Sequence, residues 1–177
     1  MSRLTRFLNF FRINKSIAID LGTSNVLIYD KQKNKIVLNE PSVIVKNRKT
    51  GEIVAVGKEA KEMEGKTAES TVVIRPLTEG VISDIDATRE MLSAFIRQIY
   101  GGSPFRPELM VCVPIEMTSI EKKAIFDAAI GAKKIYLLEE GKAAVVGSGV
   151  NISLPEGNTV IDIGGGSTDI AILSMDE

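Results

Sequence analysis

The sequence predicts an α/β fold in which a meander of three strands is followed by alternating strands and helices. Three apolar runs, at residues 16–20, 25–30 and 35–38, are separated only by short polar turns and predict the meander. Farther along the chain, apolar residues at helical spacing are interleaved with short buried runs, which predicts the alternation. A third observation is that two similar glycine turns lie near the two ends of this layout.

The elements after residue 85 are predicted from local patterns. Apolar residues recur at helical spacing between residues 86 and 100, which predicts a helix. Thr118 or Ser119 followed by Glu121 is a partial capping signal for a helix over 118–130. The other predicted elements are strands over 108–113 and 134–138, a helix over 142–148, and a hairpin of strands over 159–163 and 169–173. A meander followed by alternating strands and helices is the order of the ribonuclease-H-like fold.

The stretch between the meander and these elements is interpreted as a small inserted subdomain. Short strands are predicted over 42–46 and 53–56, and a short helix near 58–63. We place the inserted subdomain at about residues 33–75, with the main layout resuming after it.

Composition excludes several classes of function. The chain has 177 residues, and its formal net charge of −1 argues against a nucleic-acid binder that works through a basic field. The sequence contains no histidine, which excludes a Ser-His-Asp triad, a Cys-His pair and a histidine-ligated zinc site. Cys112 is the single cysteine, lies in an apolar run and is interpreted as a buried core thiol. No apolar run is long enough to span a bilayer.

The most informative feature is the pair of similar turns. Each turn follows an aspartate, Asp20 or Asp162, that ends an apolar strand, and each contains glycine and small hydroxyl residues. Glycine lets the backbone turn tightly and approach a polyphosphate, with N–H groups directed inward as an anion nest. The two aspartates suit a hydrated Mg²⁺ that bridges carboxylate to phosphate, because direct contact with phosphate would be repulsive. Hydroxyl groups that can add donors belong to Thr23, Ser24, Ser167 and Thr168.

Either turn alone is weak evidence, because a glycine-rich hairpin is usually only a hairpin. Two such turns, each behind a strand-terminal aspartate and at opposite ends of one fold, favour a functional interpretation. No G-x-x-x-x-G-K-[ST] motif occurs, and no G-x-G-x-x-G follows a strand, which excludes a Walker-type P-loop and a dinucleotide fingerprint. The sequence therefore predicts a nucleotide held between two hairpins.

This pair of turns resembles those of the superfamily that contains actin, sugar kinases and heat-shock chaperone ATPases. Further segments narrow the resemblance to the MreB family of bacterial actins, and matches run almost continuously from residue 16 to residue 174. The resemblance implies an actin-like ATPase fold of the ribonuclease-H-like class, with a first domain that carries a small inserted subdomain and ends at the start of the second domain. The segments that carry it are residues 37–43, 74–84, 111–114, 135–140 and 162–169.

The resemblance also assigns roles to individual residues. It places Asp20 and Asp162 beside the metal ion, which they would hold through water, and it implies ATP and Mg²⁺ as cofactors. Glu140 would orient the water that attacks the γ-phosphate, with Thr168 assisting, because in-line attack needs a polar group on the far side of that phosphate. The alternative for Glu140 is a surface glutamate at a helix start, where the helix dipole favours it. The residues implied to bind the nucleotide are Asp20, Gly22, Thr23, Ser24 and Asn25 in the first turn and Gly164, Gly165, Gly166, Ser167 and Thr168 in the second.

Two departures from the family pattern bear on activity. Gly141 and Lys142 replace the family's proline and methionine after the glutamate, so the helix start loses a stiffening proline and Lys142 can pair with Glu140. The family's chain is also about twice as long, and its second half supplies the adenine and ribose pocket. ATP hydrolysis coupled to polymerisation is expected of the family's full-length chain. We interpret this chain as a truncated gene product or an excised piece.

By resemblance, residues 1–15 form an amphipathic membrane-binding segment, 16–150 the first actin-like domain and 151–177 the start of the second. In the first segment, apolar residues recur at i, i+3, i+4 and i+7 beside cationic residues, a pattern typical of an interfacial helix. The alternative is a helix packed on its own domain. The residues predicted to contact lipid are Leu4, Phe7, Leu8 and Phe11 and, by resemblance, Phe105.

The function implied by the resemblance is an ATP-dependent filament protein, cytoplasmic and peripheral at the inner face of the cell membrane, that organises cell-wall synthesis and rod cell shape. Its expected partners are copies of itself, the membrane surface, and cell-wall synthesis and cell-shape proteins, with no nucleic acid. Two alternatives stay open: a chaperone-type or small-molecule ATPase of the same superfamily, and a non-functional truncated remnant. The compact insert and the amphipathic segment favour the filament protein over the other ATPases.

Overall fold

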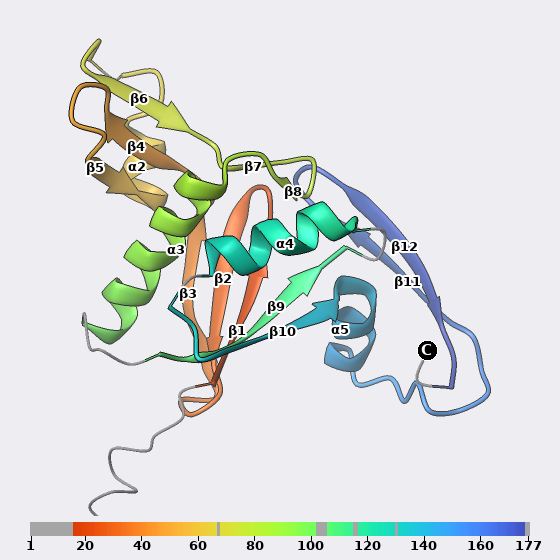
Figure 1. The fold of residues 1–177 in the computed structure, drawn as a ribbon. Helices are drawn as coiled ribbons and strands as arrows, with labels where there is room; N and C mark the ends of the chain where they lie inside the picture. The colour runs from red at the N-terminus through yellow and green to blue at the C-terminus, as the bar shows by residue number, and fades with distance from the viewer. Residues whose placement is uncertain (1–15, 67, 102–105, 115–116, 130, 176–177) are drawn as a thin grey trace, which may run out of the picture.

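A five-stranded mixed sheet, with strand order β10-β9-β1-β2-β3, forms the centre of the computed structural model (Figure 1). β1 (Ser16–Leu21), β2 (Asn25–Asp30) and β3 (Lys35–Pro41) form the predicted antiparallel meander. β9 (Glu108–Val113) lies parallel to β1, and β10 (Lys134–Glu139) lies parallel to β9. The carboxyl ends of these three parallel strands therefore meet at one edge of the sheet. The structure describes residues 16–66, 68–101, 106–114, 117–129 and 131–175.

Two helices, α3 (Ile85–Tyr100) and α4 (Ser119–Ala128), cover one face of this sheet (Figure 1). The Asp84 side chain caps α3 by accepting a hydrogen bond from the backbone N–H of residue 87 at 2.8 Å. α4 begins with a full capping box, in which Thr118 and Glu121 each bond the backbone of the other. The capping signal predicted at Thr118 is therefore confirmed.

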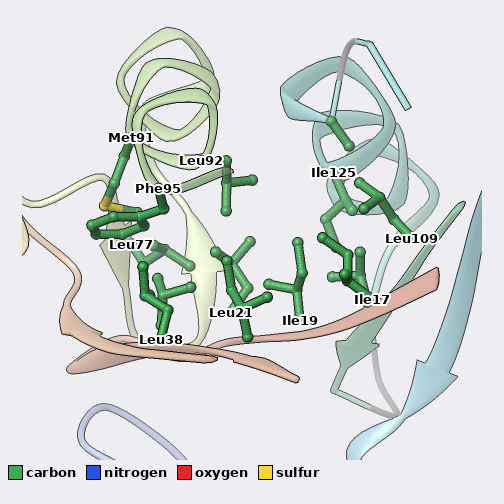
Figure 2. Close-up of a cluster of buried hydrophobic side chains, with 14 of the residues drawn as sticks. Ile17, Ile19, Leu21, Leu38, Leu77, Met91, Leu92, Phe95, Leu109 and Ile125 are labelled. Carbon is green, nitrogen blue, oxygen red and sulfur yellow. The ribbon is translucent and has the colours of Figure 1, made fainter. Parts of the chain in front are cut away.

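The main core lies between the sheet and these two helices (Figure 2). Alternate residues of β1 point into it, so that Ile17, Ile19 and Leu21 are buried while Asp20 points away from this core. Phe95 of α3 is fully buried above them. Burying a large apolar side chain contributes roughly 1.5–3 kcal/mol to the free energy of unfolding. This layer therefore fixes the edge of the sheet at which the parallel strands end. Other members are Val26, Ile28, Leu38, Leu77, Met91, Leu92, Leu109, Val111, Val113 and Ile125.

The inserted subdomain is a separate three-stranded antiparallel sheet with order β5-β4-β6, covered by α2 (Gly57–Glu62). Its strands are β4 (Ile44–Asn47), β5 (Ile53–Val56) and β6 (Thr71–Ile74). The subdomain was predicted from about residue 33, but its sheet begins at β4 because β3 pairs with β2 in the main sheet. β6 is a strand that local patterns did not predict.

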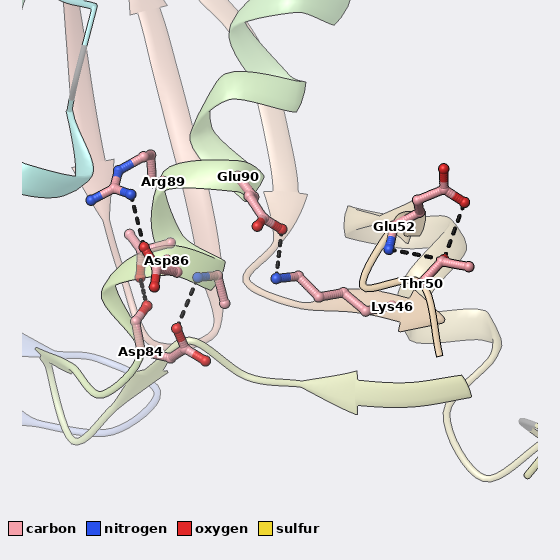
Figure 3. Close-up of polar contacts among 9 residues, drawn as sticks. Lys46, Thr50, Glu52, Asp84, Asp86, Arg89 and Glu90 are labelled. Atoms are coloured by element: carbon pink, nitrogen blue, oxygen red, sulfur yellow. Dashed lines mark hydrogen bonds and ion pairs between the residues drawn. The ribbon is translucent and has the colours of Figure 1, made fainter. Parts of the chain in front are cut away.

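The chain returns from the insert through a short antiparallel pair, β7 (Leu77–Thr78) and β8 (Val81–Ile82), which was also not predicted. An ion pair ties the insert to α3: Lys46 Nζ lies 2.6 Å from Glu90 Oε2 (Figure 3). The side chains of Lys46 and Glu90 are 16% and 37% exposed, so the ion pair between the insert and the long helix is partly shielded from solvent.

The last elements form a unit beside the main sheet (Figure 1). α5 (Glu140–Gly147) follows β10 without a loop and begins two residues earlier than predicted. The predicted hairpin, β11 (Asn158–Ile163) and β12 (Thr168–Leu173), packs one face on α5 through Val145, Ala171 and Leu173. The opposite face exposes a row of isoleucines, with exposed fractions of 59% for Ile161, 78% for Ile163, 66% for Ile170 and 71% for Ile172.

Candidate functional site

A pocket lies where the carboxyl ends of β1 and β10 meet the turn of the β11–β12 hairpin. β1 contributes its last residues and the turn that follows, β10 leads directly into Glu140, and the hairpin contributes its own turn. Segments from the two ends of the described chain are therefore brought together. The lining contains all the predicted nucleotide, metal and catalytic residues except Gly166 and Thr168, and it adds Leu21, Gly80 and Asp169.

The two turns touch each other across this pocket. A Cβ atom at Gly165 would overlap the side chain of Ser24, and one at Gly166 would lie 2.8 Å from the side chain of Thr23. Only glycine allows this approach, because every other residue carries that atom. The glycines of the second turn are therefore required for contact with the first turn.

A third segment, the β7–β8 turn, contacts both of these turns. The backbone N–H of Gly80 donates to Thr23 Oγ1 at 2.9 Å. Gly80 has a φ of +80°, and a Cβ atom there would lie 3.3 Å from Ser167 Oγ. The pocket is thus closed by three turns that are far apart in the sequence.

Four carboxyl groups line the pocket, contributed by Asp20, Glu140, Asp162 and Asp169. Asp162 and Asp169 lie directly opposite each other in the hairpin, so both side chains share its inward face. Burial and the nearby charge of Asp162 raise the pKa of Asp20. Burial, followed by the charges of Asp20, Asp169 and Asp162, raises the pKa of Glu140 to about 7.

This charge pattern fits a divalent cation. Among the described residues that line the pocket, none is a lysine or an arginine that could offset the carboxylates. Within the described ranges no three Asp, Glu or Cys side chains form a group that could hold a metal ion directly. Carboxylates at the rim of a pocket suit a hydrated Mg²⁺, which keeps most of its waters. The donor set of Asp20 and Asp162 is therefore compatible with the predicted water-mediated site.

Glu140 is the first residue of α5 and reaches the pocket from the end of β10. Thr168 does not line the pocket: it pairs with Ile163 and belongs to the exposed face of the hairpin. The hydroxyl that the second turn contributes to the lining is that of Ser167. Cys112, interpreted as a buried thiol, is partly buried beside Asp20, and burial, Asp20 and Glu140 raise its pKa to about 11.

Sequence reasoning missed Asp169 and Gly80. Asp169 could have been found by counting outward from the hairpin turn, which places it opposite Asp162. Gly80 carries no local signal, because its contacts with the other two turns arise only when the chain folds.

The residues predicted to contact lipid, Leu4, Phe7, Leu8, Phe11 and Phe105, lie outside the described residues. In the part of the chain that the structure describes, no helix is both long enough and apolar enough to cross a membrane.

Comparison with protein families gives one match that covers most of the chain. The family model described as MreB/Mbl protein matches residues 14–177. The cell shape-determining protein Mbl of Bacillus cereus is 52% identical over 164 residues, which are 91% of this chain and 49% of that protein. The cell shape-determining protein MreB of Escherichia coli is 42% identical over 180 residues, 97% of this chain and 51% of that protein. The chain spans about half the length of these curated relatives.

Comparison with solved structures also finds MreB proteins. The crystal structure of MreB5 of Spiroplasma citri bound to ADP superimposes with a TM-score of 0.83 at 37% identity, covering 93% of this chain and 50% of that one. The same protein bound to AMPPNP gives a TM-score of 0.84. A MamK double helical filament gives 0.74 at 22% identity, covering 92% of this chain and 50% of that one, a likeness of fold.

Proposed function

The chain belongs to the MreB/Mbl protein family, and on that premise we propose that it acts as an ATP-dependent, actin-like filament protein. In this proposal it lies at the inner face of the cell membrane and organises cell-wall synthesis and rod cell shape. The observation that carries the proposal is the pocket between the two glycine turns, with its four carboxyl groups. The cell-shape roles of the named relatives and the actin-like fold support it.

ATP is the proposed ligand of the pocket. MreB5 of Spiroplasma citri, which shares the fold and 37% of the aligned residues, has been crystallised with ADP and with AMPPNP. Backbone N–H groups of the turns and the hydroxyls of Thr23, Ser24 and Ser167 are the donors available to phosphate oxygens. Asp20 and Asp162 would hold Mg²⁺ through water, and the ion would neutralise charge on the phosphates.

Glu140 is the proposed orienting group for the attacking water. It lines the same pocket, and burial together with three other carboxyl groups raises its pKa to about 7, the range suited to proton exchange with water. The assisting hydroxyl was predicted at Thr168. Because Ser167 lines the pocket and Thr168 does not, we assign the assisting role to Ser167.

Assembly that depends on ATP is the direct test of this function. The 177-residue chain should sediment as polymer with Mg-ATP and stay in the supernatant without nucleotide. Gly165→Ala should abolish this response, because its methyl group forces the two turns apart. Gly157→Ala is the matched control, directly before the same hairpin, since its Cβ atom would meet Ile172 at an ordinary 3.6 Å.

The outcomes separate the alternatives. Nucleotide binding without assembly would favour a chaperone-type or small-molecule ATPase of the same superfamily. A chain that neither binds nucleotide nor assembles would favour a non-functional remnant. Equal assembly by the Gly165→Ala and Gly157→Ala variants would remove the second turn from the mechanism.

A further inference from the structure

Ser42 lies outside the pocket lining but is bonded directly to the first glycine turn. It stands between β3 and β4, where the chain leaves the main sheet for the insert, and it is fully buried. Its Oγ donates to the carbonyl oxygen of Gly22 at 2.6 Å, and its backbone N–H donates to the carbonyl oxygen of Ser24 at 2.9 Å. One residue therefore holds two carbonyl groups of the turn.

These two bonds fix the direction of the turn's N–H groups. A trans peptide unit is planar, so its C=O and its N–H point in opposite directions. Holding the Gly22 carbonyl toward Ser42 directs the Thr23 N–H away from Ser42, and holding the Ser24 carbonyl does the same for Asn25. If the Gly22 carbonyl were released, that peptide plane could rotate and present an acceptor where an anion needs a donor.

Ser42 is itself held firmly by the insert. Glu40, two residues before it, accepts a hydrogen bond from the backbone N–H of Lys58 at 2.7 Å. The carbonyl of Val43, the next residue, accepts from the N–H of Gly57 at 2.9 Å. Both partners belong to the start of α2. Hydrogen bonds from α2 to residues on both sides of Ser42 therefore fix its position, and the fixed serine in turn orients the carbonyl groups of the turn.

We propose that Ser42 is a positioning residue that holds the first glycine turn in its phosphate-binding shape and joins that turn to the inserted subdomain. That the ligand is a nucleotide rests on the proposed function. That Ser42 fixes the shape of the turn is independent of the proposed function. Ser42→Ala removes the hydroxyl and leaves the Gly22 carbonyl without that donor. The hydrogen bond from the Ser42 backbone N–H to the Ser24 carbonyl remains in this variant. The loss of order is therefore expected only around the Gly22 carbonyl.

The test compares this variant with Thr88→Val. Thr88 is also fully buried, and its Oγ1 donates to the carbonyl of Asp84 at 2.7 Å inside α3, away from the pocket. Both variants lose one buried hydroxyl–carbonyl bond, so a general loss of stability affects both. Ser42→Cys is a second variant, which fills the space of the hydroxyl with a somewhat larger thiol and donates only weakly.

Backbone ¹⁵N relaxation and Mg-ATP calorimetry on the 177-residue chain are the two readouts. In Ser42→Ala the order parameter of the Thr23 amide should fall from the rigid range of about 0.85 towards about 0.6, and Mg-ATP should bind roughly tenfold more weakly. Ser42→Cys should lie between Ser42→Ala and the parent. Thr88→Val should leave both readouts unchanged.

This design distinguishes a failure of the proposed function from a failure of the proposed role of Ser42. If the parent does not bind Mg-ATP, the proposed function fails, and the order parameter of the ligand-free turn alone decides the role of Ser42. Order parameters and affinities that are the same in the Ser42 variants as in Thr88→Val would overturn the proposal.

Discussion

Glu140 is the residue whose environment has the clearest consequence for stability. Its pKa is raised from 4.5 to about 7 by burial and by three neighbouring carboxyl groups, so the folded state prefers the protonated form. The stability that this preference contributes is present below about pH 4.5 and is lost as the pH rises through about 7. The nucleotide-free chain should therefore become less stable between pH 5 and pH 8, two values that bracket that range.

Glu140→Gln should remove this dependence. Thermal unfolding at pH 8 should show the variant more stable than the parent by about 1 kcal/mol, because screening of a half-buried carboxyl reduces the full effect of the pKa shift. At pH 5 the two should nearly coincide. In a full-length protein that contains this chain, the same variant should hydrolyse ATP on the order of 10²-fold more slowly while still binding it, since the proposed role of the carboxyl is to orient water. Parallel stability curves for the two chains would contradict the assigned environment.

Single residues were predictable where the signal is local. The positions of Asp20 and Asp162 in the pocket lining could be predicted because each precedes a glycine turn at the end of an apolar strand; their role toward a metal ion stays a prediction. The assisting hydroxyl could not be placed, because which of Ser167 and Thr168 faces inward depends on how the turn meets its neighbours. Ser42 gave no signal of its own: its contact with Gly22 joins residues 20 positions apart.

Strands and helices were predictable in proportion to their length and pattern. β9 was predicted with the limits it has, because its six residues are a clear apolar run. β7 and β8 have two residues each and were missed, since so short a stretch carries no periodicity. The start of α5 was placed too late because Glu139, Glu140 and Gly141 resemble a polar turn, whereas the helix begins directly after β10.

The β11–β12 hairpin is the element with the least support. Among the described residues only one of its faces is packed, and its four outward isoleucines are exposed. A two-stranded sheet of this kind is marginal on its own. Hydrogen exchange should therefore show much weaker protection across residues 159–173 than in β1, which lies inside the five-stranded sheet. Protection of the hairpin equal to that of β1 in a monomer would contradict this assignment.

The amphipathic segment of residues 1–15 supplies the proposed membrane contact. Deleting residues 1–11 should release the chain from anionic liposomes, because the whole apolar stripe and half of the adjoining cations are removed. Changing Phe7 and Leu8 to glutamate should have the same effect with the length kept. Nucleotide binding should be unaffected in both variants. A deleted chain that still co-sediments with vesicles as well as the parent would indicate that the segment packs on its own domain.

At the scale of the whole molecule, the prediction of two turns at opposite ends of one fold indicated where the pocket lies. The main sheet and the hairpin lie side by side so that these turns touch, and the insert enters and leaves beside the first of them (Figure 1). The order of elements predicted the main sheet, because meander and alternating units have few ways to pair. The relatives are about twice as long, and within the described residues the isoleucine face of the hairpin is exposed.

Calorimetric titration of Mg-ATP into the parent chain and into Asp162→Ala tests the central claim most directly. Asp162 lines the pocket and is the proposed partner of the metal ion, whereas Asp86 is a matched control, an exposed aspartate paired with Arg89 on α3. The account predicts that the parent and Asp86→Ala bind Mg-ATP alike and that Asp162→Ala binds at least about tenfold more weakly. Affinity unchanged by Asp162→Ala would contradict a metal–nucleotide site between the two turns.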